Sequence, residues 1–204
     1  MTPELILAYI LACLIFAVVP GPSVTLIVAN SLTHGTRAGL LNIASAQVGL
    51  ALMIAVVAVG LATLIETMGW WFDWVRYAGA AYLLWLGWKL IKTPARLEPG
   101  QAPPAPRGGF VLQGFLVVMS NPKALLLFGA FIPQFVDATG DYLAQVLLLG
   151  AIANAVAFIS DGAYAVLFGR ARVWLTEARV RLVSRISGWT LIAGAAWLAF
   201  TRAR

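Results

Sequence analysis

The chain has 204 residues, of which 61% are hydrophobic and only 11% are charged, and its mean hydropathy is +0.89. The charged share lies far below the roughly one quarter that is usual for soluble domains, which excludes an ordinary soluble protein and predicts residence in a lipid bilayer. The formal net charge of +6 does not indicate nucleic-acid binding, because the basic residues gather in the connectors between apolar segments.

The N-terminal segment is predicted to be a membrane helix over about residues 4–32. It begins Met1-Thr2-Pro3-Glu4, without the positive charges that open a signal peptide, and its apolar stretch is long, so we interpret it as an uncleaved helix. The single cysteine, Cys13, excludes an intramolecular disulfide and a cysteine-based metal cluster, and we expect it to be a buried apolar residue.

Five further apolar segments follow, and a membrane-spanning helix needs about 20 mostly apolar residues. The sequence therefore predicts an all-α membrane protein with six transmembrane helices, at about 4–32, 38–65, 70–91, 110–136, 142–168 and 184–201. The connector 92–109 is rich in Pro and Gly and is predicted to link two halves of one membrane domain, 1–204, with repeat 1 at about 4–91 and repeat 2 at about 110–201. The stretch 172–185 alternates basic and apolar residues and is interpreted as an interfacial helix.

Most basic residues lie on one side of this predicted topology. The first, third and fifth connectors hold Arg37, Lys89, Lys92, Arg96, Arg107, Arg170, Arg172, Arg179, Arg181 and Arg185. By the positive-inside rule these connectors face the cytoplasm, so both termini are predicted to face outward. In "SLTHGTRAGL", residues 31–40, we interpret Arg37 as a topology charge and His34 as a helix-end residue, with a proton-relay or gate role for His34 as the alternative.

Two of the predicted helices contain a break near the middle, at Pro20-Gly21-Pro22 and at Ser120-Asn121-Pro122-Lys123. With three helices per half, the second half enters the membrane from the opposite side, so matched breaks predict two inverted repeats with a transporter site at the midplane. A half-helix beginning at Pro22 or Pro122 would point free N–H groups and a positive dipole end at an anion such as a carboxylate. The alternative is that these prolines only kink their helices.

Lys123 and Asp161 are ionisable residues inside predicted helices, and each costs several kcal/mol there unless it is paired or solvated. They form either a structural ion pair or part of a substrate path, and a substrate could also split the pair. A zwitterionic amino acid would match Lys123 with its carboxylate and Asp161 with its ammonium. A buried Asp161 could also take and release a proton, which would couple transport to the proton gradient. Further polar residues that should face protein or water are Gln47, Asn154, Asn30 and Asn121.

Four stretches carry a resemblance to a known family: "PGP" at 20–22, "SLTHGTRAG" at 31–39, "AGAAYLLWLGWK" at 78–89 and "NPKALLLFGAFIPQF" at 121–135. With these stretches the chain resembles the lysine exporter (LysE) superfamily, most closely its homoserine and threonine exporter branch. The resemblance implies a six-helix carrier in the bacterial inner membrane. It would export homoserine, its lactone, threonine or similar neutral amino acids by proton antiport.

The resemblance also bears on individual residues, because the two breaks match the most characteristic positions of the family. Ser23 is a departure, since many relatives have Asp or Asn after "PGP" and the basic amino acid exporters carry a Gln-Asn pair, so lysine or arginine is not favoured as the substrate. The predicted substrate site comprises Pro20, Gly21, Pro22, Ser23, Gln47, Asn121, Pro122, Lys123, Asn154 and Asp161, with Asp161 also coupling protons.

Several rival functions stay open. A metal-ion exporter of the same superfamily would need several embedded ligands, whereas the sequence offers Asp161 and Cys13. An intramembrane enzyme would need a nucleophile with a base or a His-rich metal motif, and a membrane scaffold would not explain two matched breaks.

We expect no cofactor and no resident metal. The expected partners are an amino acid substrate and membrane lipid, and a homodimer is plausible because about 200 residues form only a small bundle.

Overall fold

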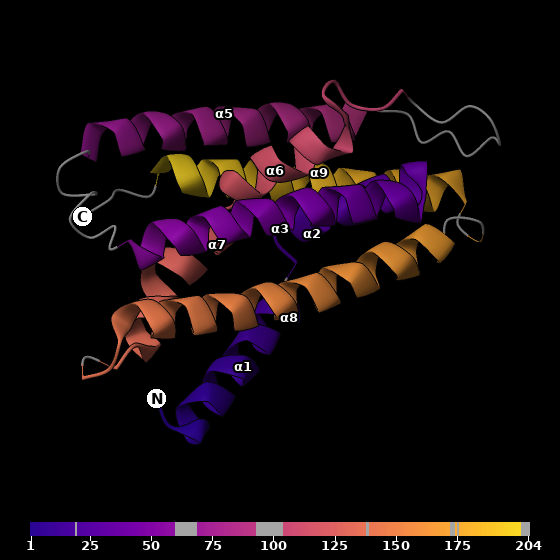
Figure 1. Ribbon diagram of the computed structural model, residues 1–204. Coiled ribbons are helices and arrows are strands. Elements are labelled where there is room, and N and C mark those ends of the chain that lie inside the picture. The colour runs from indigo at the N-terminus through magenta and orange to yellow at the C-terminus, as the bar shows by residue number, and fades with distance from the viewer. Residues whose placement is uncertain are drawn as a thin grey trace.

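The computed structural model describes residues 1–18, 20–59, 69–92, 104–137, 139–171, 174 and 176–200, and within these ranges the chain forms helices and turns but no β-strand (Figure 1). The α-helices are α1 (Pro3–Val18), α2 (Pro22–His34), α3 (Thr36–Ala58), α5 (Gly69–Lys92), α6 (Gly109–Met119), α7 (Pro122–Leu126), α8 (Tyr142–Ala171) and α9 (Glu177–Phe200). A π-helix, η1 (Leu127–Phe131), and a 3₁₀-helix, η2 (Ile132–Phe135), continue α7.

Three of the described helices are long and apolar enough to cross a membrane: α3, α8 and the part of α9 from Ala178 to Phe200. The pair α1 and α2 counts as a fourth candidate if the two helices, whose axes differ by 52°, form one broken span. The fold is therefore an all-helical membrane protein with three or four candidate spans by length and composition. Six spans, the inverted repeats and the side on which the termini lie stay predictions.

The helix boundaries agree with the predicted segments in most places, and the two breaks lie where the prolines placed them. The predicted second helix, 38–65, is described as α3 up to Ala58, and residues 60–68 lie outside the described ranges. The prediction of a separate interfacial helix is wrong for the residues from Glu177 onward, because they form the first turns of α9. Val180 is buried there and packs in one cluster with Leu32 of α2.

Small residues let several of these helices approach one another closely. A Cβ atom added to Gly87 of α5 would lie 2.6 Å from the backbone oxygen of Gly188 in α9, and one added to Gly114 of α6 would lie 2.5 Å from the backbone oxygen of Asn42 in α3. Figure 1 shows α5 beside α9, α3 beside α8, and α1 leaving the bundle at an angle.

A buried cluster of amide side chains ties α2, α3 and α6 together. Asn30 Nδ2 donates to Asn42 Oδ1 at 2.7 Å and to Gln113 Oε1 at 2.9 Å, and Asn42 Nδ2 donates to the backbone oxygen of Phe110 at 2.7 Å. All three amide side chains are buried. Because a buried amide without partners is costly, these mutually satisfied groups hold α2 in a defined position.

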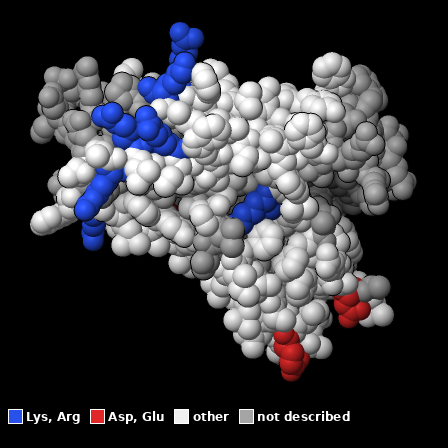
Figure 2. All heavy atoms as spheres, turned by 180° about the vertical axis from the view of Figure 1, so that it is seen from behind, with Lys and Arg blue, Asp and Glu red and all other residues white. Residues whose placement is uncertain are grey.

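Charged residues are separated along the molecule. In Figure 1 α5 and α8 end, and α3, α6 and α9 begin, at the same end of the bundle. Figure 2 shows most of the visible Lys and Arg side chains at one end of the molecule, one separate basic patch near the middle, and the visible Asp and Glu side chains toward the other end. This confirms the predicted gathering for the described residues of these helix ends: Arg37, Lys89, Lys92, Arg107, Arg170, Arg179, Arg181 and Arg185.

Candidate functional site at the helix breaks

The two helix breaks, which lie about 100 residues apart in the sequence, meet in the middle of the molecule. Asn121 Nδ2 of the second break donates a hydrogen bond of 2.8 Å to Ser23 Oγ, just after the first. Both prolines that follow the breaks face the same residue of α9, because a Cβ atom added to Gly194 would lie 3.0 Å from Pro22 Cγ and 3.9 Å from Pro122 Cγ. The tertiary fold thus brings together two motifs that the sequence shows only separately.

The first turns of the two half-helices are satisfied differently. In α2 the N-cap residue is Gly21, which has no side chain to offer, and Pro22 at the first position has no N–H. No side-chain cap hydrogen bond is formed, so the positive end of the α2 dipole is left to other groups. In α7 the side chain of Asn121 accepts a hydrogen bond of 3.0 Å from the backbone nitrogen of Lys123, an ordinary N-cap.

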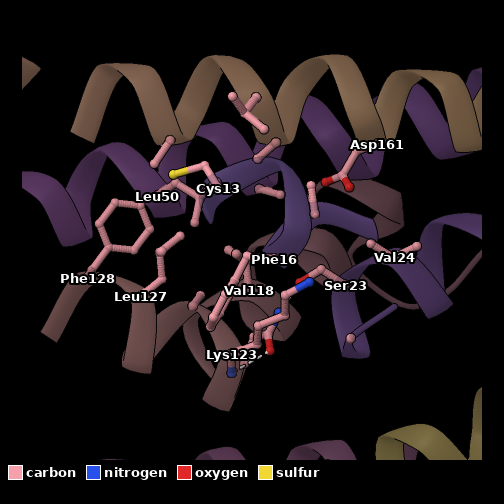
Figure 3. Close-up of a pocket in the computed structure, with 18 residues that line it drawn as sticks. Cys13, Phe16, Ser23, Val24, Leu50, Val118, Lys123, Leu127, Phe128 and Asp161 are labelled. Carbon is pink, nitrogen blue, oxygen red and sulfur yellow. Dashed lines mark hydrogen bonds between the residues drawn. The ribbon is translucent and has the colours of Figure 1, made fainter. Parts of the chain in front are cut away.

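A cavity of about 80 Å³ lies beside the breaks, which is room for several water molecules. It is enclosed by α1, α2, α3, α6, α7, η1 and α8. Its lining divides into a few polar groups at the breaks and on α8, and a larger apolar remainder (Figure 3). The residues that line it are Cys13, Phe16, Ala17, Gly21, Ser23, Val24, Ala46, Leu50, Val118, Asn121, Lys123, Ala124, Leu127, Phe128, Ala153, Val156, Ala157 and Asp161.

Lys123 and Asp161 approach this cavity from opposite sides. Figure 3 shows both side chains directed into the cavity, Asp161 from α8 and Lys123 from α7. Asp161 is only 8% exposed, Lys123 Nζ lies 5.5 Å from the centroid of the Phe16 ring, and the two opposite charges attract each other. The α2 N-terminus is on the Lys123 side, since a Cβ atom added to Gly21 would lie 3.1 Å from Lys123 Cδ. The cavity therefore has one positive and one negative wall.

The apolar part of the lining was not foreseen from the sequence. Leu50, Leu127 and Phe128 lie together at the end of the cavity away from Asp161 and Ser23 (Figure 3). In the sequence these side chains look like any others in apolar helices, so no signal singled them out. The lining therefore has the chemical character that complements a solute with a zwitterionic part and an apolar part.

The structure brings together half of the predicted site residues. Gly21, Ser23, Asn121, Lys123 and Asp161 line the cavity. Pro22 and Pro122 lie buried beside Gly194, where they shape the breaks, and Pro20 is exposed.

Gln47 of α3 and Asn154 of α8 are not among the residues that line this cavity. Gln47 Nε2 and Asn154 Oδ1 are nevertheless buried without a hydrogen-bond partner among the described residues. A role in substrate binding for these two residues stays a prediction.

His34 lies apart from this arrangement, whereas Cys13 and Asp161, the two candidate metal ligands, both line the cavity. The His34 ring packs edge-on against Phe110, with 5.0 Å between the ring centroids, near the junction of α2 and α3. In the ranges that the structure describes, no three His, Cys, Asp or Glu side chains come close enough together to hold a metal ion.

Comparison with known proteins decides the family. The family model of the LysE type translocators matches residues 14–202. The chain belongs to this family. It is also 32% identical over 176 residues to a homoserine/homoserine lactone efflux protein of Salmonella typhimurium, which covers 86% of this chain and 85% of that protein.

Two further relatives of this LysE type translocator are similar over shorter stretches. A leucine efflux protein of Klebsiella pneumoniae is 34% identical over 133 residues, 64% of this chain and 63% of that protein. An uncharacterized membrane protein of Vibrio cholerae is 34% identical over 151 residues, 71% of each chain. No solved structure matches the chain. The protein is therefore a membrane transporter of the amino acid efflux type and not an enzyme.

Proposed function

We propose that this LysE type translocator exports small neutral amino acids, such as homoserine, homoserine lactone or threonine, across the bacterial inner membrane in exchange for protons. The observation that carries the proposal is the cavity with Lys123 and the uncapped start of α2 on one wall and Asp161 on the other. The basic end of the bundle would face the cytoplasm, in keeping with the positive-inside rule.

A bound amino acid would use both walls of the cavity. Its carboxylate would lie at Lys123 and the first turn of α2, where the ammonium charge and the helix dipole both favour an anion. Its ammonium group would lie at Asp161. Charge-assisted hydrogen bonds of this kind are about twice as strong as neutral ones, so zwitterionic homoserine or threonine would bind more tightly than homoserine lactone, whose ring ester offers Lys123 only a neutral carbonyl oxygen.

Proton coupling follows if the substrate ammonium and a proton compete for the Asp161 carboxylate. Outward release of the substrate would leave the Asp161 carboxylate exposed to an external proton. Protonation would then remove the negative charge that Lys123 attracts, before the empty carrier returns. Because a buried carboxylate must be paired or neutralised, the empty carrier would return more readily with the proton bound. One substrate leaves for each proton that enters.

Pairing of corresponding helices supports the inverted repeats that such an exchange needs. The third helices of the two halves, α5 and α9, pack against each other, and so do the second helices, α3 and α8. Both broken helices meet at Ser23 and Asn121. This pairing is what a two-fold axis in the membrane plane would produce, and rocking of one repeat against the other would open the cavity to each side in turn.

A second candidate substrate is an apolar neutral amino acid such as leucine. The apolar end of the cavity, with Leu50, Leu127 and Phe128, favours it, because an aliphatic side chain gains by burial there while a hydroxyl group would lack a partner. One relative is named a leucine efflux protein. A lysine substrate is less favourable because its second ammonium group would meet this apolar wall, and a metal ion would find few ligands.

The test is efflux of labelled homoserine, threonine, leucine and lysine from preloaded proteoliposomes, with and without an imposed pH gradient. We expect gradient-driven efflux of a neutral amino acid for the natural chain, and loss of the gradient dependence in Asp161→Asn, which keeps the size of the side chain but cannot exchange a proton. Asp141→Asn is the matched control, because Asp141 accepts a hydrogen bond from Ala144 N near the start of α8, which an Asn oxygen can also accept. Full gradient-driven transport by Asp161→Asn would refute the coupling role, and efflux of lysine alone would refute the substrate class.

A further inference from the structure

A second hollow lies between α5 and α6, and none of the residues that line it also lines the cavity at the helix breaks. It has a volume of about 110 Å³. Along α5 it is lined by Tyr82, Trp85, Leu86 and Lys89, and its other wall is the turn before α6 and that helix as far as Leu116. We call it the α5–α6 groove.

The groove is cationic at one end and apolar along the rest. Lys89 lies near the end of α5 and Arg107 just before the start of α6, and these helix ends lie at the same end of the bundle (Figure 1). From there the groove continues between Leu86 of α5 and Leu112 and Leu116 of α6. At this end of the bundle α5 ends and α6 begins. Going away from it along the groove, each wall therefore presents first its cation and then its apolar side chains.

Two local features strengthen the positive end. The N-cap of α6 is Gly108, which forms no side-chain cap hydrogen bond, so the start of the helix adds a partial positive charge. The Lys89 ammonium lies 5.2 Å from the centroid of the Trp85 ring, and Trp85 is 53% exposed. Exposed tryptophan next to lysine at a helix end is typical of the interface between lipid headgroups and hydrocarbon.

The inner wall of the groove is held in place by buried hydrogen bonds. Gln113 lines the groove and is only 7% exposed, and its Oε1 accepts a hydrogen bond of 2.9 Å from Asn30 Nδ2 of α2. Asn30 in turn donates to Asn42 of α3. A groove wall that is fixed by two other helices is ordered before a ligand arrives, so binding costs less conformational entropy.

We propose that the α5–α6 groove binds an anionic phospholipid, with the headgroup phosphate at Lys89 and Arg107 and an acyl chain along Leu86, Leu112 and Leu116. Two cations and a helix N-terminus complement a net negative headgroup, whereas the choline cation of a zwitterionic lipid would meet like charge. The apolar side chains that continue the groove away from its cations suit the start of an acyl chain and not a free anion. This site depends on the membrane location of the chain and not on the identity of the transported substrate.

The test measures lipid binding to the purified, delipidated full chain by native mass spectrometry, with phosphatidylglycerol and phosphatidylcholine of identical acyl chains. For the natural chain we expect the first phosphatidylglycerol to bind more tightly than phosphatidylcholine. In the double variant Lys89→Gln/Arg107→Gln the affinity for phosphatidylglycerol should fall roughly 25-fold, about fivefold for each cation. If the double variant does not fold, the single variant Lys89→Gln is measured in its place, and its affinity for phosphatidylglycerol should fall about fivefold.

A matched control separates this site from general attraction to a basic surface. Arg170→Gln/Arg179→Gln removes the same charge from the same end of the bundle but leaves the groove intact, so the preference for phosphatidylglycerol should persist. An equal loss in both double variants would overturn the proposal. So would displacement of the lipid by millimolar inorganic phosphate, which would identify a free-anion site, or equal affinity of the natural chain for both lipids.

Discussion

The first helix break leaves the start of α2 without a side-chain cap, whereas the second break caps the start of α7 with Asn121. Gly21 supplies no hydrogen-bonding side chain, and the residue that follows it is a proline. Asn121 instead uses both ends of its amide, since Oδ1 accepts from Lys123 N and Nδ2 donates to Ser23 Oγ. One break therefore keeps its dipole end open toward the cavity, and the other is satisfied and holds its neighbour in place.

The helices that follow the breaks differ as well. After the first break α2 is a regular helix of 13 residues that ends at His34. After the second, α7 gives way after five residues to the π-helix η1, in which the N–H of Ile132 donates to the oxygen of Leu127, and then to the 3₁₀-helix η2. Pro133 lies in η2 and cannot donate a backbone hydrogen bond. Because π-turns recur at functional sites, this irregular stretch is a further indication that the second break lies at the functional site.

The largest expected effect is at the second break, where Lys123 is the one cation among the described residues that line the cavity. Lys123→Ala should lower efflux at least tenfold, because a charge-assisted hydrogen bond contributes about 1.5–3 kcal/mol and its loss leaves Asp161 buried without that counter-charge. The measurement is the initial efflux rate in proteoliposomes, together with the melting temperature of the variant.

Lys92→Ala is the control for Lys123→Ala. Lys92 lies at the end of α5 with its ammonium 4.5 Å from the centroid of the Trp88 ring, and it lines neither the cavity nor the α5–α6 groove. Its removal should leave efflux unchanged. A folded Lys123→Ala variant with full efflux would show that the second break does not provide the substrate contact.

A smaller effect is expected at the first break from Gly21→Ala. The φ angle of Gly21 is −106°, which alanine tolerates, but the new Cβ would lie 3.1 Å from Lys123 Cδ and would displace that side chain by a few tenths of an ångström. We expect KM to rise roughly threefold to tenfold with little loss of stability, since small misplacements of a binding group are costly.

Gly162→Ala in α8 is the matched substitution, because a Cβ atom there meets nothing within 4 Å. It should leave KM unchanged and stabilise the helix by roughly 0.5–1 kcal/mol. If Gly21→Ala behaved in the same way, the close approach of the first break to Lys123 would have no part in binding.

The smallest expected effect concerns the hydrogen bond that joins the two breaks. Asn121→Ala should lower the free energy of unfolding by about 1–2 kcal/mol, through loss of the α7 cap and of the bond to Ser23. In a double-mutant cycle with Ser23→Ala the two effects should be non-additive by about 0.5–1.5 kcal/mol.

Thr33→Ala provides the reference for that cycle. Its hydroxyl donates to Ala29 O within α2 and does not join the breaks, so Asn121→Ala and Thr33→Ala should be additive. If the changes in the free energy of unfolding were also additive for Asn121→Ala and Ser23→Ala, the two breaks would not be coupled by their hydrogen bond.

Much of the local structure could be predicted because its causes are local. A proline has no amide hydrogen, so "PGP" and "NPK" locate the breaks before any fold is known. Lys123 and Asp161 lie in apolar helices, and isolated charges are expensive in lipid. The sequence alone therefore also indicates that these two residues belong to a functional site. α9 begins earlier than the sequence predicts, at Glu177 and not at about 184, because the basic residues of 177–185 look interfacial in the sequence whereas Val180 packs in one cluster with Leu32.

The sequence by itself determined which segments are helical, where two of them break and which charges they bury, because proline geometry, hydropathy and charge act on the chain locally. Only the tertiary structure decided that both breaks meet beside Gly194, that Asp161 shares a cavity with Lys123 while Gln47 and Asn154 do not line it, and that Asn30, Asn42 and Gln113 satisfy one another. The partners of a buried side chain depend on the rotation and approach of neighbouring helices. Those are set by packing between segments far apart in the sequence.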